Sequence, residues 1–382
     1  AESGSRDGRL KVRSLLRRVI RVLVAGFALA LLLMVAVLIS SWHCKLQGQI
    51  PPSAQRPSDR TAVTAGIADY ARPEDETYLS YPEWYIVWSY QEKADFQEKN
   101  LPSGFPFFGA VQQYWGSYCC VAHLIRGRYP FNGGEHVMLV VIGTSFTTEY
   151  VLKGLYEKTI GKISEWCSGG KSVEEDQYAY QVAREYAEFV HVRPFYEFHF
   201  ARQVKGLWSK TPFWGAHVVR KWERKVFLTA DYTFEAFYCW LIQIGTHLTY
   251  GSEPASTYAW IDGGNETQLQ QVPHAKTVQQ AGTHTFIVEI PRYQEFTSVA
   301  AALAERDIQF VEVAGNSRII ISVIAPEAWH YGGTDAQQLF ATRILTHPEL
   351  QRVVLGCEVT SLSALLETLR LGRVRIEHVY DY

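Results

Sequence analysis

The chain has 382 residues, long enough for two domains. Its formal net charge is −2, so its composition gives no sign of a nucleic-acid-binding protein. Only 20% of the residues are charged, whereas 14% are aromatic, and the 11 Trp and 22 Tyr suit interfaces and membrane surfaces as well as a protein core.

An apolar run near the N-terminus is the clearest single signal. The 21 residues Val22–Trp42 contain no charged side chain. A bilayer core of about 30 Å needs roughly 20 apolar residues in a helix, so the run predicts a membrane-spanning helix. A cleaved signal peptide would have a shorter apolar core followed by a small-x-small site. We therefore expect an uncleaved anchor.

Basic residues before the run predict its orientation. Arg17, Arg18 and Arg21 precede it, and Trp42 stands at its far end, where an indole is favourable at headgroup depth. Positive flanks stay in the cytoplasm. We expect residues 1–21 to be a cytoplasmic basic tail, with the bulk of the chain in the periplasm and the span in a bacterial inner membrane. The expected partners are membrane lipids and integral membrane proteins, and not nucleic acid.

Composition divides the rest of the chain into four parts. Residues 43–72 are rich in Pro, Ser, Ala and Arg and predict an extended tether. Residues 73–250 predict an aromatic-rich helical domain. The polar, Gly- and Pro-bearing residues 251–283 predict a linker, and residues 284–382 an α+β domain.

Several helices are expected between residues 73 and 250. A capping-box pattern, Ser172 with Glu175, predicts the start of one of them. Val137–Thr148 is uncharged but too short to span a bilayer, so it indicates burial in the fold, the commoner outcome, or contact with the bilayer surface. The expected helices begin after Pro73, restart after Tyr81-Pro82, and then cover Gln112–Leu124, Glu135–Trp166, Ser172–Val192, a segment ending near Trp208, and Ala216–Tyr250.

Strand and helix signals alternate in the C-terminal part. Their order, βαββαβαβ, predicts a ferredoxin-like split unit with one extra helix and strand. The expected strands are Thr285–Ile290, Ile308–Val313, Arg318–Ile324, Val353–Val359 and Val374–Tyr380, and the expected helices are Gln294–Arg306, Asp335–Thr346 and Ser361–Leu371.

One pattern could bind a metal. Glu188 and His191 form a Glu-x-x-His on a predicted helix, with Glu185 one turn earlier. Carboxylate-bridged di-iron proteins use two such motifs and two further glutamates, for which Glu149 is one possible source. A second Glu-x-x-His on another predicted helix is missing from the sequence. Ion pairs of Glu185 and Glu188 with nearby arginines (Arg184, Arg193 or Arg202) are the alternative explanation.

The segment Gly104–Trp115 is unusually aromatic. It favours core packing first, a protein contact second, and a groove for a lipid, quinone or pigment third. The residues assigned to a possible partner contact are Phe105, Phe107, Phe108, Tyr114 and Trp115.

Cysteine spacing and catalytic motifs indicate little chemistry. The six cysteines form no Cys-x-x-Cys pair and predict buried thiols or at most one or two disulfides. A phosphate loop and a Gly-x-Ser-x-Gly motif are both missing from the sequence, and no cofactor can be assigned. We therefore expect a non-catalytic accessory or scaffold subunit that docks on a membrane protein complex through its span and aromatic helical domain. The alternatives are a membrane-tethered metalloenzyme with a Glu/His site, and a lipid, quinone or pigment binder.

Overall fold

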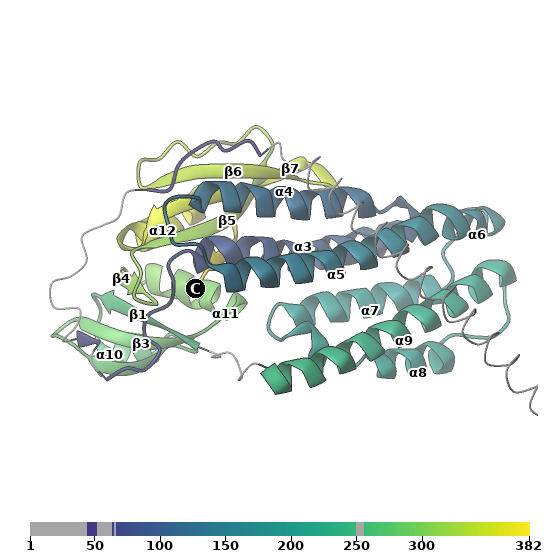
Figure 1. Cartoon of the computed structure of the whole chain (residues 1–382), viewed down its shortest axis with the longest axis horizontal. Coiled ribbons are helices and arrows are strands. Elements are labelled where there is room, and N and C mark those ends of the chain that lie inside the picture. The colour runs from purple at the N-terminus through teal and green to yellow at the C-terminus, as the bar shows by residue number, and fades with distance from the viewer. Residues whose placement is uncertain (1–43, 52–62, 65, 250–255) are drawn as a thin grey trace, which may run out of the picture.

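The computed structural model describes residues 44–51, 63–64, 66–249 and 256–382. The apolar run 22–42 and its basic flank lie outside these residues. Among the residues described, no helix is long and apolar enough to cross a membrane. This part of the chain is mostly helical, with two small antiparallel sheets. Figure 1 shows the helices between residues 133 and 249 extending to one side, and the strands, with the helices between residues 266 and 371, gathered at the other.

The helical half follows most of the expected boundaries. The expected helix 135–166 is one continuous path, in which a π-helical turn (Glu157–Gly161) joins α5 to α6. The expected restart after Pro82 is wrong, because α3 continues through this proline in its second turn. The helices are α3 (Glu76–Lys99), α4 (Phe107–Ile125), α5 (Gly133–Tyr156), α6 (Lys162–Cys167), α7 (Glu174–Val190), α8 (Phe200–Lys210) and α9 (Val218–Thr249).

The start of α7 differs from the predicted capping box. The Val173 backbone N–H donates to Asp176 Oδ2 at 3.1 Å, so one half of a capping box forms one residue later than expected, and the other half is missing because the Val173 side chain has no acceptor. Glu175 is instead fully buried and pairs with Lys221 at 3.1 Å. A buried carboxylate requires a partner charge, which explains why this glutamate does not cap the helix.

Helices α5 and α9 lie side by side. Lys153 of α5 forms ion pairs with Asp231 and Glu235 of α9, each at 3.1 Å. The rings of Tyr156 and Phe227 stack with their centroids 3.9 Å apart. Helix α3 packs against α4, α5 and α7, and α8 packs against α9.

The strands form two four-stranded sheets, in the orders β2-β3-β1-β4 and β6-β7-β5-β8. All the pairings are antiparallel. The elements are β1 (Ser256–Asp262), α10 (Glu266–Gln270), β2 (Lys276–Gln280), β3 (Thr285–Pro291), α11 (Gln294–Ala304), β4 (Gln309–Val313), β5 (Arg318–Pro326), β6 (Ala336–Ile344), β7 (His347–Glu358), α12 (Leu362–Leu371) and β8 (Arg375–Tyr380).

The two sheets repeat one topology. In each sheet the order is second, third, first and fourth strand along the chain, and a helix (α11 or α12) precedes the fourth strand. These two helices pack against each other. The described C-terminal half is therefore two consecutive modules, residues 256–313 and 318–380.

Two expectations in this half are wrong. The expected linker 251–283 contains β1, α10 and β2. The expected helix Asp335–Thr346 is the strand β6, whose buried residues Ala336, Leu339, Phe340 and Ile344 happen to follow a helical spacing. Bulges between Gln338 and Phe340 and between Arg343 and Ile344 produce this spacing, because each bulge shifts the alternation of a strand by one residue.

A shared core joins the helices to the second sheet. Thr77 Oγ1 donates to the Tyr380 carbonyl at 2.7 Å, and the ring of Trp84 lies on that of His378 at a centroid distance of 3.7 Å. Arg352 of β7 is 2% exposed and pairs with Glu92 of α3 at 3.1 Å. The two halves therefore pack as one body.

Residues 44–51 are packed against this body, although they fall in the expected tether. Cys44 forms a disulfide with Cys120 of α4. The Gln47 backbone N–H donates to the Leu339 carbonyl at 2.8 Å, which places the segment along β6. Arg128 donates to the Gln49 side chain at 3.0 Å. We call residues 44–51 the strap; it brings the start of the folded body forward from residue 73 to residue 44.

Candidate functional site: a buried ion-pair cluster and an apolar helix face

The residues predicted to bind a metal have separate partners. Glu185 accepts a hydrogen bond from Arg202 at 3.0 Å, and Glu188 pairs with Arg184 at 3.0 Å. These ion pairs confirm the alternative explanation. His191 Nδ1 lies 2.6 Å from the Ala187 carbonyl, to which it donates. Among the described residues, no group of three or more His, Cys, Asp or Glu side chains could hold a metal ion.

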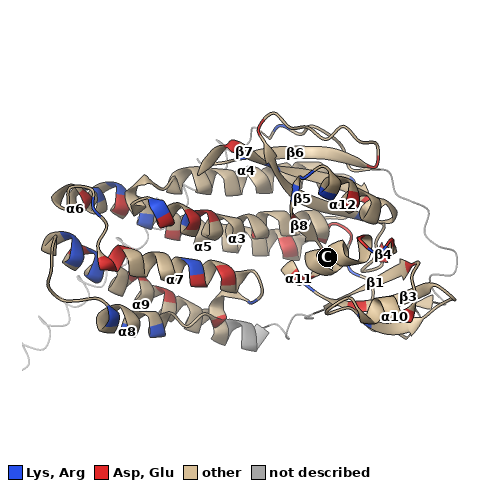
Figure 2. Ribbon diagram, turned by 180° about the vertical axis from the view of Figure 1, so that it is seen from behind, with Lys and Arg blue, Asp and Glu red and all other residues tan. Residues whose placement is uncertain are grey.

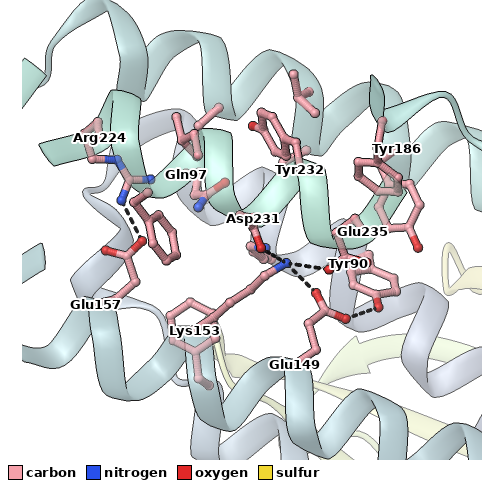
Figure 3. A pocket seen from close by; sticks show the side chains of 18 residues that line it. Tyr90, Gln97, Glu149, Lys153, Glu157, Tyr186, Arg224, Asp231, Tyr232 and Glu235 are labelled. Atoms are coloured by element: carbon pink, nitrogen blue, oxygen red, sulfur yellow. Dashed lines mark hydrogen bonds and ion pairs between the residues drawn. The ribbon is translucent and has the colours of Figure 1, made fainter. Parts of the chain in front are cut away.

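The fourth residue of that set, Glu149, lies in a small cavity between α3, α5, α7 and α9 (Figure 3). The cavity volume is about 60 Å³. At its centre Lys153 Nζ contacts three carboxylates: Glu149 at 2.8 Å, and Asp231 and Glu235 at 3.1 Å each. The Tyr90 hydroxyl donates to the other oxygen of Glu149 at 2.6 Å. We call Glu149, Lys153, Asp231 and Glu235 the Lys153 cluster.

The groups of this cluster differ in how they titrate. Burial raises the pKa of Glu235 to about 7, because it outweighs the opposing effect of the Lys153 ammonium. Glu149 is also buried, but the ammonium groups of Lys153 and Lys93 hold its pKa below the usual value. Burial and the neighbouring Lys153 together lower the pKa of Lys93. Glu235 is therefore the carboxyl in this cluster that takes up a proton near neutral pH.

A second ion-pair cluster fills the space next to the first half of α9. Arg220, Lys221, Arg224 and Lys225 are each 1% exposed or less. Arg220 pairs with Asp176 at 2.7 Å, and Arg224 with Glu157 at 2.7 Å. Further acidic partners come from α6, α7 and α9 itself: Glu165, Glu174, Glu175 and Glu223. The charges of α9 are thus neutralised inside the helical half.

The outer side of α9 is consequently apolar. Over residues 218–244, where the side chains are described, every charged residue of α9 is buried or half-buried. The exposed residues over the same range are uncharged: Val218, Val219, Val226, Ala230, Thr233, Phe234, Phe237, Trp240, Leu241 and Ile244.

Helix α5 presents the same pattern. Over its described length its exposed residues are Gly134, Val137, Val141, Thr144, Thr148, Leu152 and Leu155, none of them charged. Exposed Ile160, Ile163 and Trp166 continue the row through the π-helical turn and α6. Because the contacts between α5 and α9 leave these two rows on one side, we call the exposed uncharged residues of α5, the π-helical turn, α6 and α9 the α5–α9 face. Lys158 of the π-helical turn and Lys162 of α6 are also exposed and are not part of it.

The opposite side of the helical half is polar. Figure 2 shows charged residues along α7 and α8. The exposed residues of α7 are Glu174, Gln177, Gln181, Arg184, Glu185 and Glu188, and those of α8 include Arg202, Lys205 and Lys210. The two sides of the same group of helices therefore suit different environments.

Most of the aromatic residues assigned to a partner contact are in the core. Phe105, Phe107, Tyr114 and Trp115 are each 1% exposed or less, and they pack with residues such as Tyr85, Phe146 and Tyr150. Phe108 is 44% exposed. Core packing accounts for the four buried residues, and only Phe108 offers a surface for a partner.

Sequence reasoning missed the ion-pair clusters and the α5–α9 face. The available signal was the basic sequence 220–225 on one predicted helix and the acidic sequence 174–176 on another, whose charges are complementary. In the Lys153 cluster, the Lys153 ammonium neutralises the neighbouring carboxylates, and burial raises the pKa of Glu235 so that it binds a proton more readily. No protein-family model, curated protein or solved structure matches this chain. The function is therefore argued from these contacts alone.

Proposed function

We propose that this protein is a single-pass membrane-anchored accessory or scaffold subunit, with most of its mass on the outer face of a bacterial inner membrane, which docks on a membrane protein complex. The strap carries this proposal. The apolar run Val22–Trp42 ends two residues before Cys44, and Cys44 is bonded to Cys120 in the folded body. A span in the run would therefore hold the body directly at the membrane surface, without a long tether.

The disulfide also supports the proposed side of the membrane. Disulfides persist in oxidising compartments such as the periplasm and are rare in the cytosol. The arginines before the run predict the same orientation for an independent reason, because positively charged flanks of a membrane span stay on the cytoplasmic side. Both arguments favour an N-terminus inside and a folded body outside.

At the level of fold, each four-stranded module is proposed to be a ferredoxin-like unit. The strand order of both sheets supports this, since a split βαβ unit places its third strand between the first and second. Residues 256–313 also have the βαββαβ element order of that unit, whereas residues 318–380 have no helix between their first two strands, β5 and β6. The proposed units cover residues 256–313 and 318–380, instead of the single unit expected over 284–382. This fold hosts many unrelated functions, so it implies no activity.

The two alternative functions have less support in the geometry. The residues of the Glu/His metal site pair with arginines, a lysine and a backbone carbonyl. The cavity at the Lys153 cluster holds about 60 Å³, whereas sites for small organic ligands usually hold roughly 300–1,000 Å³. An apolar groove of about 550 Å³ at α8 and α9, lined by Trp208, Val226 and Phe234 among others, falls within that range but is widely open to solvent, whereas ligand sites enclose most of their ligand. The accessory role therefore remains the favoured one.

Co-purification tests the docking role. The full chain is isolated from its native membrane in mild detergent, and the proteins recovered with it are identified by mass spectrometry. We expect an integral membrane protein at a constant ratio, with its recovery reduced by Phe108→Glu. The matched control is Val278→Glu, which changes an exposed hydrophobic residue of β2 (42% exposed). Recovery of no membrane protein above background would overturn the proposal.

Reversal of the basic flank tests the orientation. Arg17, Arg18 and Arg21 are changed together to Glu, and a reporter that is active only outside the cytoplasm is fused after Tyr382. We expect the wild-type fusion to be active and the triple variant to lose activity, because the positive flank sets the direction of insertion. An inactive wild-type fusion that is nevertheless expressed and stable would contradict the proposed placement.

A further inference from the structure

The α5–α9 face exposes several large apolar side chains to water. Leu152, Val226, Phe234 and Phe237 on it are each at least 56% exposed. Each Å² of apolar surface removed from water contributes about 25 cal/mol, so covering this face is strongly favourable. Contiguous apolar patches of this kind mark contact sites for proteins or membranes.

We propose that the α5–α9 face lies in the interfacial layer of a lipid bilayer, the same membrane that holds the expected span. This inference rests on the proposed anchoring. It names lipid, instead of another protein, as the surface that covers α5 and α9. The helices would lie along the membrane plane, since none of the described helices is long and apolar enough to cross it.

The position of the strap favours lipid as the occupant. The apolar run ends two residues before Cys44. Cys44 packs in the same hydrophobic cluster as Leu139 of α5 and is bonded to Cys120 of α4. The Tyr114 hydroxyl of α4 donates to the Leu139 carbonyl at 2.6 Å, so this part of α4 lies against the first half of α5. The strap therefore joins the residues after the expected span to α4, the neighbour of α5, so a span would hold the helical half that carries the α5–α9 face at the bilayer.

The threonines on the face provide a second argument. Thr144 Oγ1 donates to the Val140 carbonyl at 2.7 Å, and Thr233 Oγ1 to the Thr229 carbonyl at 2.6 Å. Thr148 and Thr159 donate in the same way, at 2.8 and 2.6 Å, to the carbonyl four residues earlier. A hydroxyl facing hydrocarbon must find its partner within its own helix, because lipid offers none. In a protein interface, polar side chains such as these form hydrogen bonds to the partner, at roughly one bond per 100–200 Å² of interface area.

The distribution of charge and of tryptophan agrees with this orientation. A lipid-facing helix keeps its ionisable groups on the inner side, where they pair, as Arg220, Arg224 and Lys153 do. Trp166 and Trp214, near the end of α6 and the start of α9, are 74% and 73% exposed. Indole rings favour the headgroup level of a bilayer. The polar outer sides of α7 and α8 would then face water.

Lipid-chain quenching tests the proposal on the full chain. A fluorescent amino acid is introduced singly at Val141, Leu152 or Phe237, and the protein is reconstituted in phosphatidylcholine nanodiscs with or without brominated acyl chains. Gln181, exposed on α7, is the water-facing control position. Leu32, within the apolar run, reports separately on the expected span. Thermal unfolding midpoints identify any labelled variant that is not folded. If the variant labelled at one of the three face positions does not fold, the variants labelled at the other two still provide the measurement.

We expect bromine quenching at the three face positions to be several-fold greater than at Gln181. Quenching at Leu32 with none at the face would overturn the lipid contact and leave the anchoring intact. Quenching at the face without quenching at Leu32 would support the lipid contact and contradict the anchoring. If the face labels are shielded from both brominated lipid and aqueous iodide, a protein or a second copy of the chain covers them, and the inference is wrong.

Discussion

The sulfur atoms of Cys44 and Cys120 are bonded across a sequence separation of 76 residues. This bond joins the strap to α4, next to the hydrophobic cluster that contains Leu139 and Tyr380. A segment that composition alone describes as a tether is thereby part of the folded body. The same bond attaches Cys44, which follows the apolar run by two residues in the sequence, to α4.

Loss of this disulfide should destabilise the protein. Because it closes a long loop in the unfolded chain, we expect Cys120→Ser to lower the unfolding free energy by about 2–4 kcal/mol. Chemical denaturation of the full chain in mild detergent, without reductant, measures the change. The neighbouring Cys119→Ser is the matched control and should keep the cross-link. Under denaturing conditions without reductant, the pairing predicts four free thiols in the wild type and five in Cys120→Ser, and six free thiols in the wild type would contradict it.

Removal of the central cation of the Lys153 cluster should have a larger effect. Lys153→Met leaves Glu149, Asp231 and Glu235 facing one another without their shared ammonium. Breaking a buried ion pair by removing one partner costs about 3–5 kcal/mol. Unfolding followed by tryptophan fluorescence measures this cost.

The control for Lys153→Met is Lys205→Met, because Lys205 is exposed on α8. Such a surface substitution should change stability by about 0.5 kcal/mol or less. Equal effects of the two substitutions would mean that the Lys153 ion pairs contribute nothing to the association of α5 with α9.

Glu235 should make the stability depend on pH. Its folded-state pKa is raised to about 7, from an ordinary value of 4.5, chiefly by burial. Between these values the folded protein holds a proton that the unfolded chain has released. The contribution of this group to stability is therefore fully present below pH 4.5 and is lost as the pH rises through about 7.

The substitution Glu235→Gln should reduce the loss of stability that accompanies a rise in pH. The other groups that surround the site are unchanged in the variant, namely Lys93, Glu149, Lys153, Tyr186 and Asp231. The raised pKa values of Glu76 and Asp381 also affect both proteins equally. The measurement is the difference in unfolding midpoint between variant and wild type at pH 5 to 8, with the exposed Glu185→Gln as control. Parallel curves for Glu235→Gln and wild type would disprove the assignment.

Glu188→Ala distinguishes an ion pair from a metal ligand. The pair of Glu188 with Arg184 is exposed, and such pairs contribute about 0–1 kcal/mol, so we expect a stability change within that range. Elemental analysis of the purified full chain accompanies the measurement. Stoichiometric iron or manganese that disappears in Glu188→Ala would establish the metalloenzyme alternative instead.

Local sequence patterns were sufficient for most of the helices and for the strands with strong β propensity. The 3.6-residue periodicity identified 135–166 and 216–250 as helical, and β-branched residues identified Arg318–Ile324 as a strand. These signals are local because the hydrogen bonds of a helix and the alternation of a strand depend on neighbouring residues. The alternative explanation for Glu185 and Glu188, ion pairing with arginines, was also available from the sequence.

Long-range contacts decided the rest. Bulges set by pairing with β7 made 336–344 a strand despite its helical spacing. The partner of Cys44 depends on how the strap lies against α4. The sequence predicted α9 as a helix, but not which of its sides points inward. Tertiary structure decided this, because the carboxylates that neutralise Arg220 and Arg224 come mainly from Glu157 and Asp176, on segments 44–67 positions away. With those partners in place the charged side is buried, and the apolar side is left at the surface.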